Sequence, residues 1–254
     1  MFNCLLRSVY RPAFLIIALA SSGCASMNGS TDPHDPLEGY NRAIYQFNQD
    51  FDQAFGKPIA KAYEKVVPSP INKGITNFFS NLYDVTVLAN SLLQLKFAQA
   101  AQDSMRIFFN TTIGLLGFFD VATFMELPRH NEDFGQTLGY WGVPPGPYFV
   151  LPFIGPSTIR DSAGIATDWY FFDPVFNQRV ALRNSLLVVN FIDTRADLLD
   201  ATRFLNMAAL DPYVFTREAY LQRRRYLVYD GNPPPEKFDD SEDGPSPDTD
   251  NPAE

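Results

Sequence analysis

Residues 134–161 read FGQTLGYWGVPPGPYFVLPFIGPSTIRD, and the rest of the chain is arranged on either side of this Gly/Pro stretch. Five glycines and five prolines alternate there with large apolar and aromatic side chains. Glycine permits backbone angles that are closed to other residues, whereas proline fixes φ and removes an amide donor. We therefore predict neither a helix nor a central strand through the middle of the stretch.

The Gly/Pro stretch also carries side chains that are costly to leave in water: Tyr140, Trp141, Tyr148, Phe149, Val150, Leu151, Phe153 and Ile154. Full burial of one such side chain is worth roughly 1.5–3 kcal/mol. The stretch is thus predicted to be a structured bridge that packs on apolar surface and places the helices on both sides. Two interpretations stay open, a buried connection between helices and a hinge or lip of a site.

The chain before the stretch reads as helices, and the first has a start signal. Asp35 suits the N-cap, Pro36 the first helical position, and Glu38 can reach back to the cap. Large apolar side chains then recur at helical spacing: Tyr40, Ile44, Phe47, Phe51 and Phe55. This pattern predicts an amphipathic helix whose apolar stripe faces either a core or a membrane interface.

Further helices are predicted for residues 57–67, 69–96, 97–125 and 179–210, and a last one is capped by Asp211 and Pro212. Residues 107–125 have Asp120 as their only charge, but that Asp and the polar and Gly residues around it suit a bilayer span poorly. A helical hairpin that breaks near Gly114 or Gly117 is expected there instead. Strand signals are almost absent, apart from a short extended pair around residues 148–153, so the fold class is all-α.

The N-terminus has the pattern of a lipoprotein signal peptide. Residues 1–23 carry two arginines, a short apolar run and then small residues, directly before Cys24. The run is too short to cross a bilayer, which takes about 20 apolar residues. We predict cleavage before Cys24, acylation of Cys24 by chains such as palmitate, and a linker over residues 24–34. Ala25 is the residue type that favours the outer membrane, by resemblance to enterobacterial sorting.

The C-terminal residues 230–254 form an acidic tail. They hold nine acidic residues, one lysine and six prolines, a composition that buries too little to fold. The formal charge of the whole chain is −9, of which the tail supplies −8. The remaining body, residues 35–229, is predicted to be one domain, and without a strongly basic face it disfavours nucleic-acid binding.

Catalytic motifs are missing from the sequence. Neither a nucleophile elbow, a His-Glu-x-x-His pair nor a phosphate loop occurs, and neither cysteines nor clustered histidines support a metal site. A hydrolase would need His130 near Ser157 or Ser162, with Asp161 or Asp168 as the acid. We therefore predict no catalytic residue, no metal and no cofactor, and keep an enzyme that uses His130 as the alternative.

Two groups of arginines remain as binding candidates. Arg160 most simply pairs with Asp161, but in an aromatic surround it could also meet a phosphate. The cluster at residues 223–225 lies near a helix C-terminus, where cations are favoured. Lipid headgroups or an acidic partner are its functional interpretations.

Several motifs, in order from about residue 35 to residue 224, together resemble the MlaA (VacJ) family of outer-membrane lipoproteins. They are DPLEGYNR (35–42), FFNT (108–111), GFFDVA (117–122), DFGQTLG (133–139), GPY (146–148), LPF (151–153), DPY (211–213) and REAY (217–220). The resemblance implies a ring of amphipathic helices that lies in the inner leaflet of the outer membrane and binds trimeric porins. It also implies removal of stray outer-leaflet phospholipid through an amphipathic channel to a periplasmic carrier, MlaC.

The resemblance suggests roles for individual residues. A mobile hinge would contain Gly139, Gly142, Val143 and Pro144, and Arg160 becomes a candidate headgroup contact. Pro144 stands where relatives can have glycine, which bears on the freedom of the hinge. The carrier would dock on the last helix, with Arg217, Arg223 and Arg224 as candidates. The alternatives are a membrane-anchored phospholipase or acyltransferase and a purely structural envelope lipoprotein.

Overall fold

The computed structural model describes residues 35–235. The predicted signal peptide, Cys24, the linker and most of the acidic tail lie outside the described residues, so those assignments stay predictions. Within residues 35–235 no helix has the length and hydropathy that crossing a membrane demands.

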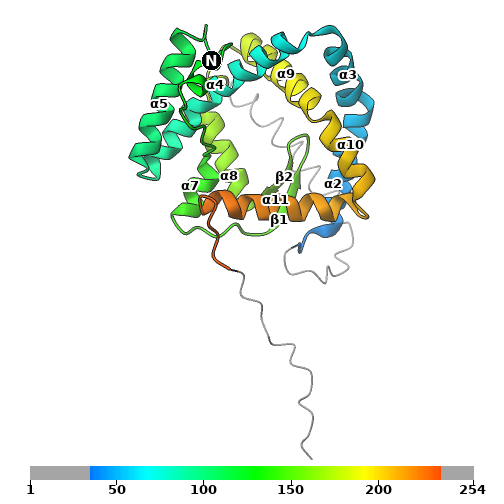
Figure 1. Ribbon diagram of the computed structural model, residues 1–254. Helices are drawn as coiled ribbons and strands as arrows, with labels where there is room; N and C mark the ends of the chain where they lie inside the picture. The colour runs from blue at the N-terminus through cyan, green and yellow to red at the C-terminus, as the bar shows by residue number, and fades with distance from the viewer. Residues whose placement is uncertain (1–34, 236–254) are drawn as a thin grey trace, which may run out of the picture.

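Helices follow one another around a ring (Figure 1), and the predicted all-α class is confirmed. In chain order they are α2 (Glu38–Phe51), α3 (Lys57–Val66), α4 (Ser69–Leu93), α5 (Phe97–Thr112), α6 (Val121–Phe124), α7 (Phe134–Tyr140), α8 (Ile159–Thr167), α9 (Val180–Asp197), α10 (Leu199–Ala208) and α11 (Pro212–Val228). Two π-helical turns, Asp52–Gly56 and Asp168–Phe172, follow α2 and α8. In Figure 1, α11 runs along the bottom, and the hairpin β1–β2 points from it toward the middle of the ring.

The Gly/Pro stretch is neither helix nor central strand in its middle, as predicted. It begins with α7, continues as an exposed loop over residues 141–147, and then forms an antiparallel hairpin of β1 (Tyr148–Leu151) and β2 (Gly155–Thr158). The sequence predicted the extended pair only up to residue 153, and the second strand lies beyond it. Tyr148 and Val150 are buried against Tyr213 of α11, so the hairpin packs on the last helix.

Two predicted helix boundaries are wrong. Asp35 does not cap α2, because its carboxylate accepts hydrogen bonds from Asn41, Tyr213 and Arg217. Residues 179–210 form not one helix but two, α9 and α10, which meet at Leu198. The break near Gly114 and Gly117 is confirmed, since α5 ends at Thr112 and a turn separates it from α6.

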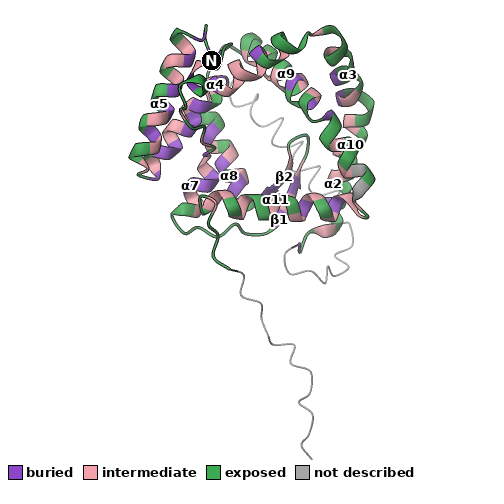
Figure 2. Ribbon diagram, in the orientation of Figure 1, coloured by how far each residue is buried: buried purple, intermediate pink, exposed green. Residues whose placement is uncertain are grey.

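The interior of the described part is polar, and large apolar side chains face outward. Twenty-two buried residues are polar or charged, whereas the nine buried hydrophobic residues include three alanines. Figure 2 shows the buried residues gathered where α4, α5, α7 and α8 meet and at the hairpin, with exposed residues along α3, α9 and α10. Phe124, Phe204 and Leu210 are among many large side chains left exposed. In a water-soluble domain most large apolar side chains are buried and most polar side chains are exposed.

Candidate functional site

The loop at residues 141–147, called here the Gly/Pro loop, is exposed along its whole length. Gly142 has φ of +89°, a left-handed angle that other residues rarely adopt, and a Cβ placed there would meet nothing within 4 Å. Val143 and Pro144 follow it and are also exposed. Three of the four residues predicted to form a hinge are therefore adjacent in one open loop.

Gly139, the fourth predicted hinge residue, lies within α7 and has a different role. A Cβ at Gly139 would approach Arg160 Nη1 to 2.8 Å and a methyl carbon of Val228 to 2.9 Å. Such distances leave no room for a side chain, so Gly139 allows α7, α8 and α11 to pack closely at the base of the loop.

Arg160 lies beneath the Gly/Pro loop and is only 8 % exposed. Its Nε and Nη2 donate to Oδ1 of Asp161 at 3.1 and 3.0 Å, which is the local ion pair considered from the sequence. Its Nη1 donates to the Val143 carbonyl at 3.4 Å, and its backbone N–H donates to the Pro145 carbonyl at 3.2 Å. A headgroup contact at Arg160 stays a prediction.

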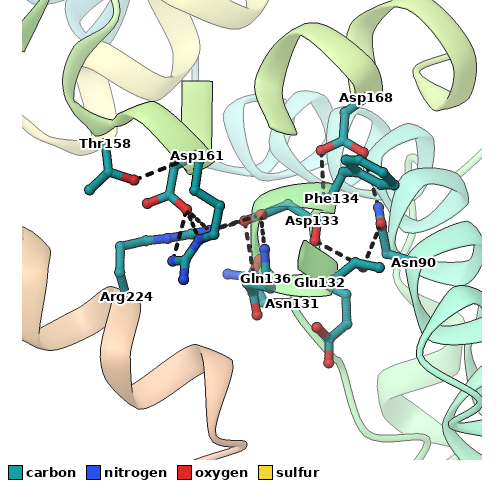
Figure 3. A network of polar contacts seen from close by, with 12 residues as sticks. Asn90, Asn131, Glu132, Asp133, Phe134, Gln136, Thr158, Asp161, Asp168 and Arg224 are labelled. Atoms are coloured by element: carbon teal, nitrogen blue, oxygen red, sulfur yellow. Dashed lines mark hydrogen bonds and ion pairs between the residues drawn. The ribbon is translucent and has the colours of Figure 1, made fainter. Parts of the chain in front are cut away.

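Arg224 of α11 joins α7 and α8 in a buried network (Figure 3). Its Nη1 and Nη2 donate to the two oxygens of Asp133 at 2.5 and 2.9 Å, and Nη2 also donates to Oδ1 of Asp161 at 2.9 Å. Asp133 is the N-cap of α7, and the side chain of Thr158 is the N-cap of α8. The guanidinium therefore fixes the starts of both helices relative to α11.

Charges in this network shift the pKa values of its carboxyl groups. Burial alone would raise the pKa of Asp161, but the guanidiniums of Arg224 and Arg160 and the Tyr220 hydroxyl outweigh it and hold that pKa below its usual range. Asp133 likewise has a lowered pKa, because its hydrogen bonds and charge pairing with Arg224 outweigh burial. Both carboxyl groups are therefore ionised at neutral pH and neutralise the two arginines.

Asp168 lies beside this network, but no arginine among residues 35–235 is bonded to it. It accepts hydrogen bonds from the Phe134 amide and the Asn90 side chain, at 2.9 and 3.0 Å (Figure 3). Burial raises its pKa to about 6 against the effect of these two hydrogen bonds. This carboxyl therefore gains a proton in mildly acidic conditions, unlike Asp133 and Asp161.

The three predicted docking arginines of α11 have different surroundings. Arg217 is buried and pairs with Asp35 at 3.1 Å, Arg224 belongs to the network above, and Arg223 is exposed. Arg217 and Arg224 are seven residues apart, which places them on the same side of a helix. That spacing was the signal in the sequence that both could face inward.

The hairpin is attached to α2 by two asparagines that are also seven residues apart. Asn41 donates to the Tyr148 carbonyl at 3.2 Å and accepts from the Val150 amide at 2.8 Å. Asn48 donates to the Leu151 carbonyl at 2.9 Å and accepts from the Phe153 amide at 2.8 Å. Each amide side chain thus pairs with the backbone of the hairpin as a neighbouring strand would, and neither pairing was predicted from the sequence.

The hydrolase arrangement weighed from the sequence does not assemble. Nδ1 of His130 lies 2.6 Å from Asp103, whose other oxygen accepts from Ser91. Ser157 instead bonds with Ser162, their hydroxyl oxygens 2.7 Å apart. His130 lines a cavity of about 870 Å³ between the α4–α5 turn and the end of α11. Residues 35–235 contain no cluster of potential ligands that could hold a metal ion.

The fold and the exposed apolar surface define an amphipathic, membrane-associated helical domain without a spanning helix among its described residues. A profile of the MlaA lipoprotein family matches residues 33–227. The chain therefore belongs to the MlaA lipoprotein family, and the resemblance inferred from the motifs is confirmed.

Curated relatives and a solved structure agree with this membership. The intermembrane phospholipid transport system lipoprotein MlaA of Escherichia coli is 36% identical over 228 residues, 88% of each chain. The protein of the same name from Haemophilus influenzae is 34% identical over 225 residues, 85% of this chain and 89% of its own. A solved structure described as "Structural basis for maintenance of bacterial outer membrane lipid asymmetry" matches with a TM-score of 0.68 and 36% identity, covering 76% of this chain and 98% of its own.

Proposed function

We propose that this protein is an outer-membrane lipoprotein of the Mla pathway that keeps the outer membrane asymmetric. It takes mislocalised phospholipid from the outer leaflet through an amphipathic channel and passes it to a periplasmic carrier, MlaC. The acylated Cys24 anchors it on the periplasmic side, and a trimeric porin is its partner in the membrane. The relatives' names, intermembrane phospholipid transport system lipoprotein, support this role.

The observation that carries the proposal is that polar side chains are buried while many large apolar side chains are exposed. Phe124 is 88% exposed and Leu210 fully exposed, with many other large apolar side chains in the same state. Covering such a surface with hydrocarbon gains roughly 25 cal/mol per Å². Lipid covers it without a spanning helix if the ring lies within one leaflet. A path past hydrocarbon costs a phospholipid headgroup less where polar groups line it.

Transport needs no covalent step, and the moving part is the Gly/Pro loop with Gly142, Val143 and Pro144. Gly139 supports the base of that loop, and Arg160, which donates to two of its carbonyls, is the candidate contact for a headgroup phosphate. On α11, the exposed Arg223 is the docking contact for the carrier, while Arg217 and Arg224 hold the helix that presents it. His130 has no role in transport, and a His130→Ala variant is expected to transport normally.

The decisive experiment measures outer-leaflet phospholipid in cells that lack the protein. We expect surface phospholipid to rise on deletion and to fall again with the wild-type gene. Val143→Glu, which puts a charge on the Gly/Pro loop without a strained backbone, is expected to fail to restore asymmetry while still reaching the membrane. Gly39→Glu, the same added charge on the exposed start of α2, is the control. Unchanged surface phospholipid on deletion would contradict the transport role.

A further inference from the structure

The Gly/Pro loop has few attachments to the rest of the protein. The Gly142 and Val143 amides bond back to α7, to the carbonyls of Gly139 and Leu138 at 2.9 Å each. Residues 144, 145 and 147 are prolines and have no amide to donate. In the described part of the chain, the hydrogen bonds that reach the carbonyls of Val143 and Pro145 both come from Arg160. One residue therefore fastens the outer part of the loop.

The position of Arg160 is set by its neighbours rather than by its own flexible side chain. Two of its nitrogens are held by Asp161 Oδ1, and the missing side chain of Gly139 leaves the space that Nη1 occupies. The guanidinium is consequently confined between α7, the carboxylate of Asp161 and the loop. A shift of Asp161 would move it away from the Val143 carbonyl, where its bond is already long.

Asp161 is in turn held from α11. Its Oδ1 accepts from Arg224 at 2.9 Å and its Oδ2 from the Tyr220 hydroxyl at 2.8 Å. Two arginines thus share one buried carboxylate oxygen, and Asp133 supplies the second negative charge. Hydrogen bonds to a charged group are among the stronger ones in proteins, and removing one partner from a buried ion pair is costly.

We propose that Arg160 is a positioning residue for the Gly/Pro loop, and that Arg224 sets the position of Arg160 through the shared carboxylate of Asp161. A partner that docks on α11 and displaces Arg224 then releases the loop. This regulation rests on the proposed function, in which the carrier docks on α11 and the loop moves during transport. The link itself is a property of the isolated protein and needs no transport to be measured.

The test is amide hydrogen exchange of the full-length lipoprotein in lipid nanodiscs, without any carrier. The amide of residue 160 donates to the Pro145 carbonyl and reports directly on loop release, together with the amides of Gly142 and Val143. Arg160→Ala and Arg224→Ala are each expected to speed exchange of these amides about tenfold. Arg223→Ala removes the same charge from the exposed side of α11 and is the matched control, with no change expected.

The double variant Arg160→Ala/Arg224→Ala decides whether the two residues act in series. If they do, the loop amides of the double variant exchange no faster than those of the faster single variant. The second substitution then acts on a connection between α11 and the loop that the first has already removed. Effects that multiply would overturn the proposal, as would an Arg224→Ala variant with wild-type exchange at residues 142, 143 and 160. Exchange in α2 and α9 has to remain at the wild-type rate in every variant.

Milder changes keep the proposal testable if Arg224→Ala unfolds the region where α7, α8 and α11 meet. Tyr220→Phe removes only the hydroxyl that donates to Asp161 and is expected to speed loop exchange about threefold. Arg224→Lys keeps a positive charge and is expected to lie between wild type and Arg224→Ala. Either variant with no effect on the loop amides, in a folded protein, would contradict the series arrangement.

Transport assays separate this inference from the proposed function. Cells with Arg224→Ala are expected to show altered surface phospholipid if loop release matters for transport. Faster loop exchange together with normal surface phospholipid would keep the structural link and reject its use in transport. Unchanged loop exchange together with raised surface phospholipid would reject the link and leave the transport role intact.

Discussion

Two neighbouring parts of the Gly/Pro stretch both contain glycine and proline but have different surroundings. Residues 141–147 form an exposed loop that Arg160 fastens at two carbonyls, whereas residues 148–158 form a hairpin with a buried first strand. The hairpin is paired with α2 through Asn41 and Asn48 and packs on Tyr213 of α11. Glycine and proline thus decide which backbone conformations a segment can adopt, and contacts with neighbouring elements decide whether one conformation is held.

Removing the Asn41 side chain, which pairs with the buried end of the hairpin, is expected to lower the free energy of unfolding most. Asn41→Ala leaves the Val150 amide and the Tyr148 carbonyl without their partner and removes a 2.7 Å hydrogen bond to Asp35. Because buried groups left unpaired are costly, the free energy of unfolding should fall by about 3 kcal/mol. Denaturant unfolding in mild detergent, followed by circular dichroism, measures the loss.

Asn48→Ala is the matched variant at the outer end of the same hairpin. It removes the same kind of backbone pairing, but the Phe153 amide there is exposed and water can replace the lost partner. We expect a loss of about 1 kcal/mol. Equal losses at the two positions would show that the buried end is not what holds the hairpin.

The next largest effect is expected where α7 and α8 cross below the Gly/Pro loop. A Cβ at Gly164 would lie 2.4 Å from the backbone nitrogen of Gly135, so Gly164→Ala forces the two helices apart. Overpacking of this kind costs about 2 kcal/mol. The same unfolding measurement on Gly39→Ala provides the control, because a Cβ added at Gly39 would meet nothing within 4 Å and alanine favours the helix. A destabilised Gly39→Ala would mean that alanine itself, not crowding, is the cause.

A smaller effect compares the Gly/Pro loop directly with the hairpin. Gly142 in the loop and Gly155 in the hairpin both have left-handed φ angles, +89° and +101°, with open space around them. Gly155→Ala should cost about 1 kcal/mol, because the paired strands keep the strained angle. Gly142→Ala should cost less than about 0.5 kcal/mol, because the loop can adjust its backbone. A larger cost at Gly142 would mean that the loop is held as firmly as the hairpin.

The last expected effect is a dependence of stability on pH at the start of α7, where Asp168 accepts from the Phe134 amide. Burial raises the pKa of Asp168 from 3.8 to about 6, so between these values the folded protein binds this proton and the unfolded chain does not. The stability of the wild type should therefore fall, relative to Asp168→Asn, as pH rises from about 4 to about 6, and then level off. Thermal unfolding of both proteins across this range tests it, and parallel curves would contradict the raised pKa.

Several features of this protein followed from the sequence alone because they depend on neighbouring residues. Asp211 caps α11 as predicted, since its carboxylate needs only the amides of Tyr213 and Val214. The break after α5 and the irregular middle of the Gly/Pro stretch likewise follow from local glycine and proline chemistry. The spaced motifs were enough to identify the family.

Other features were decided only when distant segments came together. Asp35 was expected to cap α2, yet its carboxylate serves Tyr213 and Arg217, residues 178 and 182 positions away. Arg224 belongs to a cluster that the sequence analysis offered to lipid headgroups or an acidic partner, but it lies between Asp133 and Asp161. Local sequence patterns act over about one helical turn, and which charges meet depends on how helices far apart in the chain cross. The tertiary structure therefore decided which arginines fasten the ring and which remain at its surface.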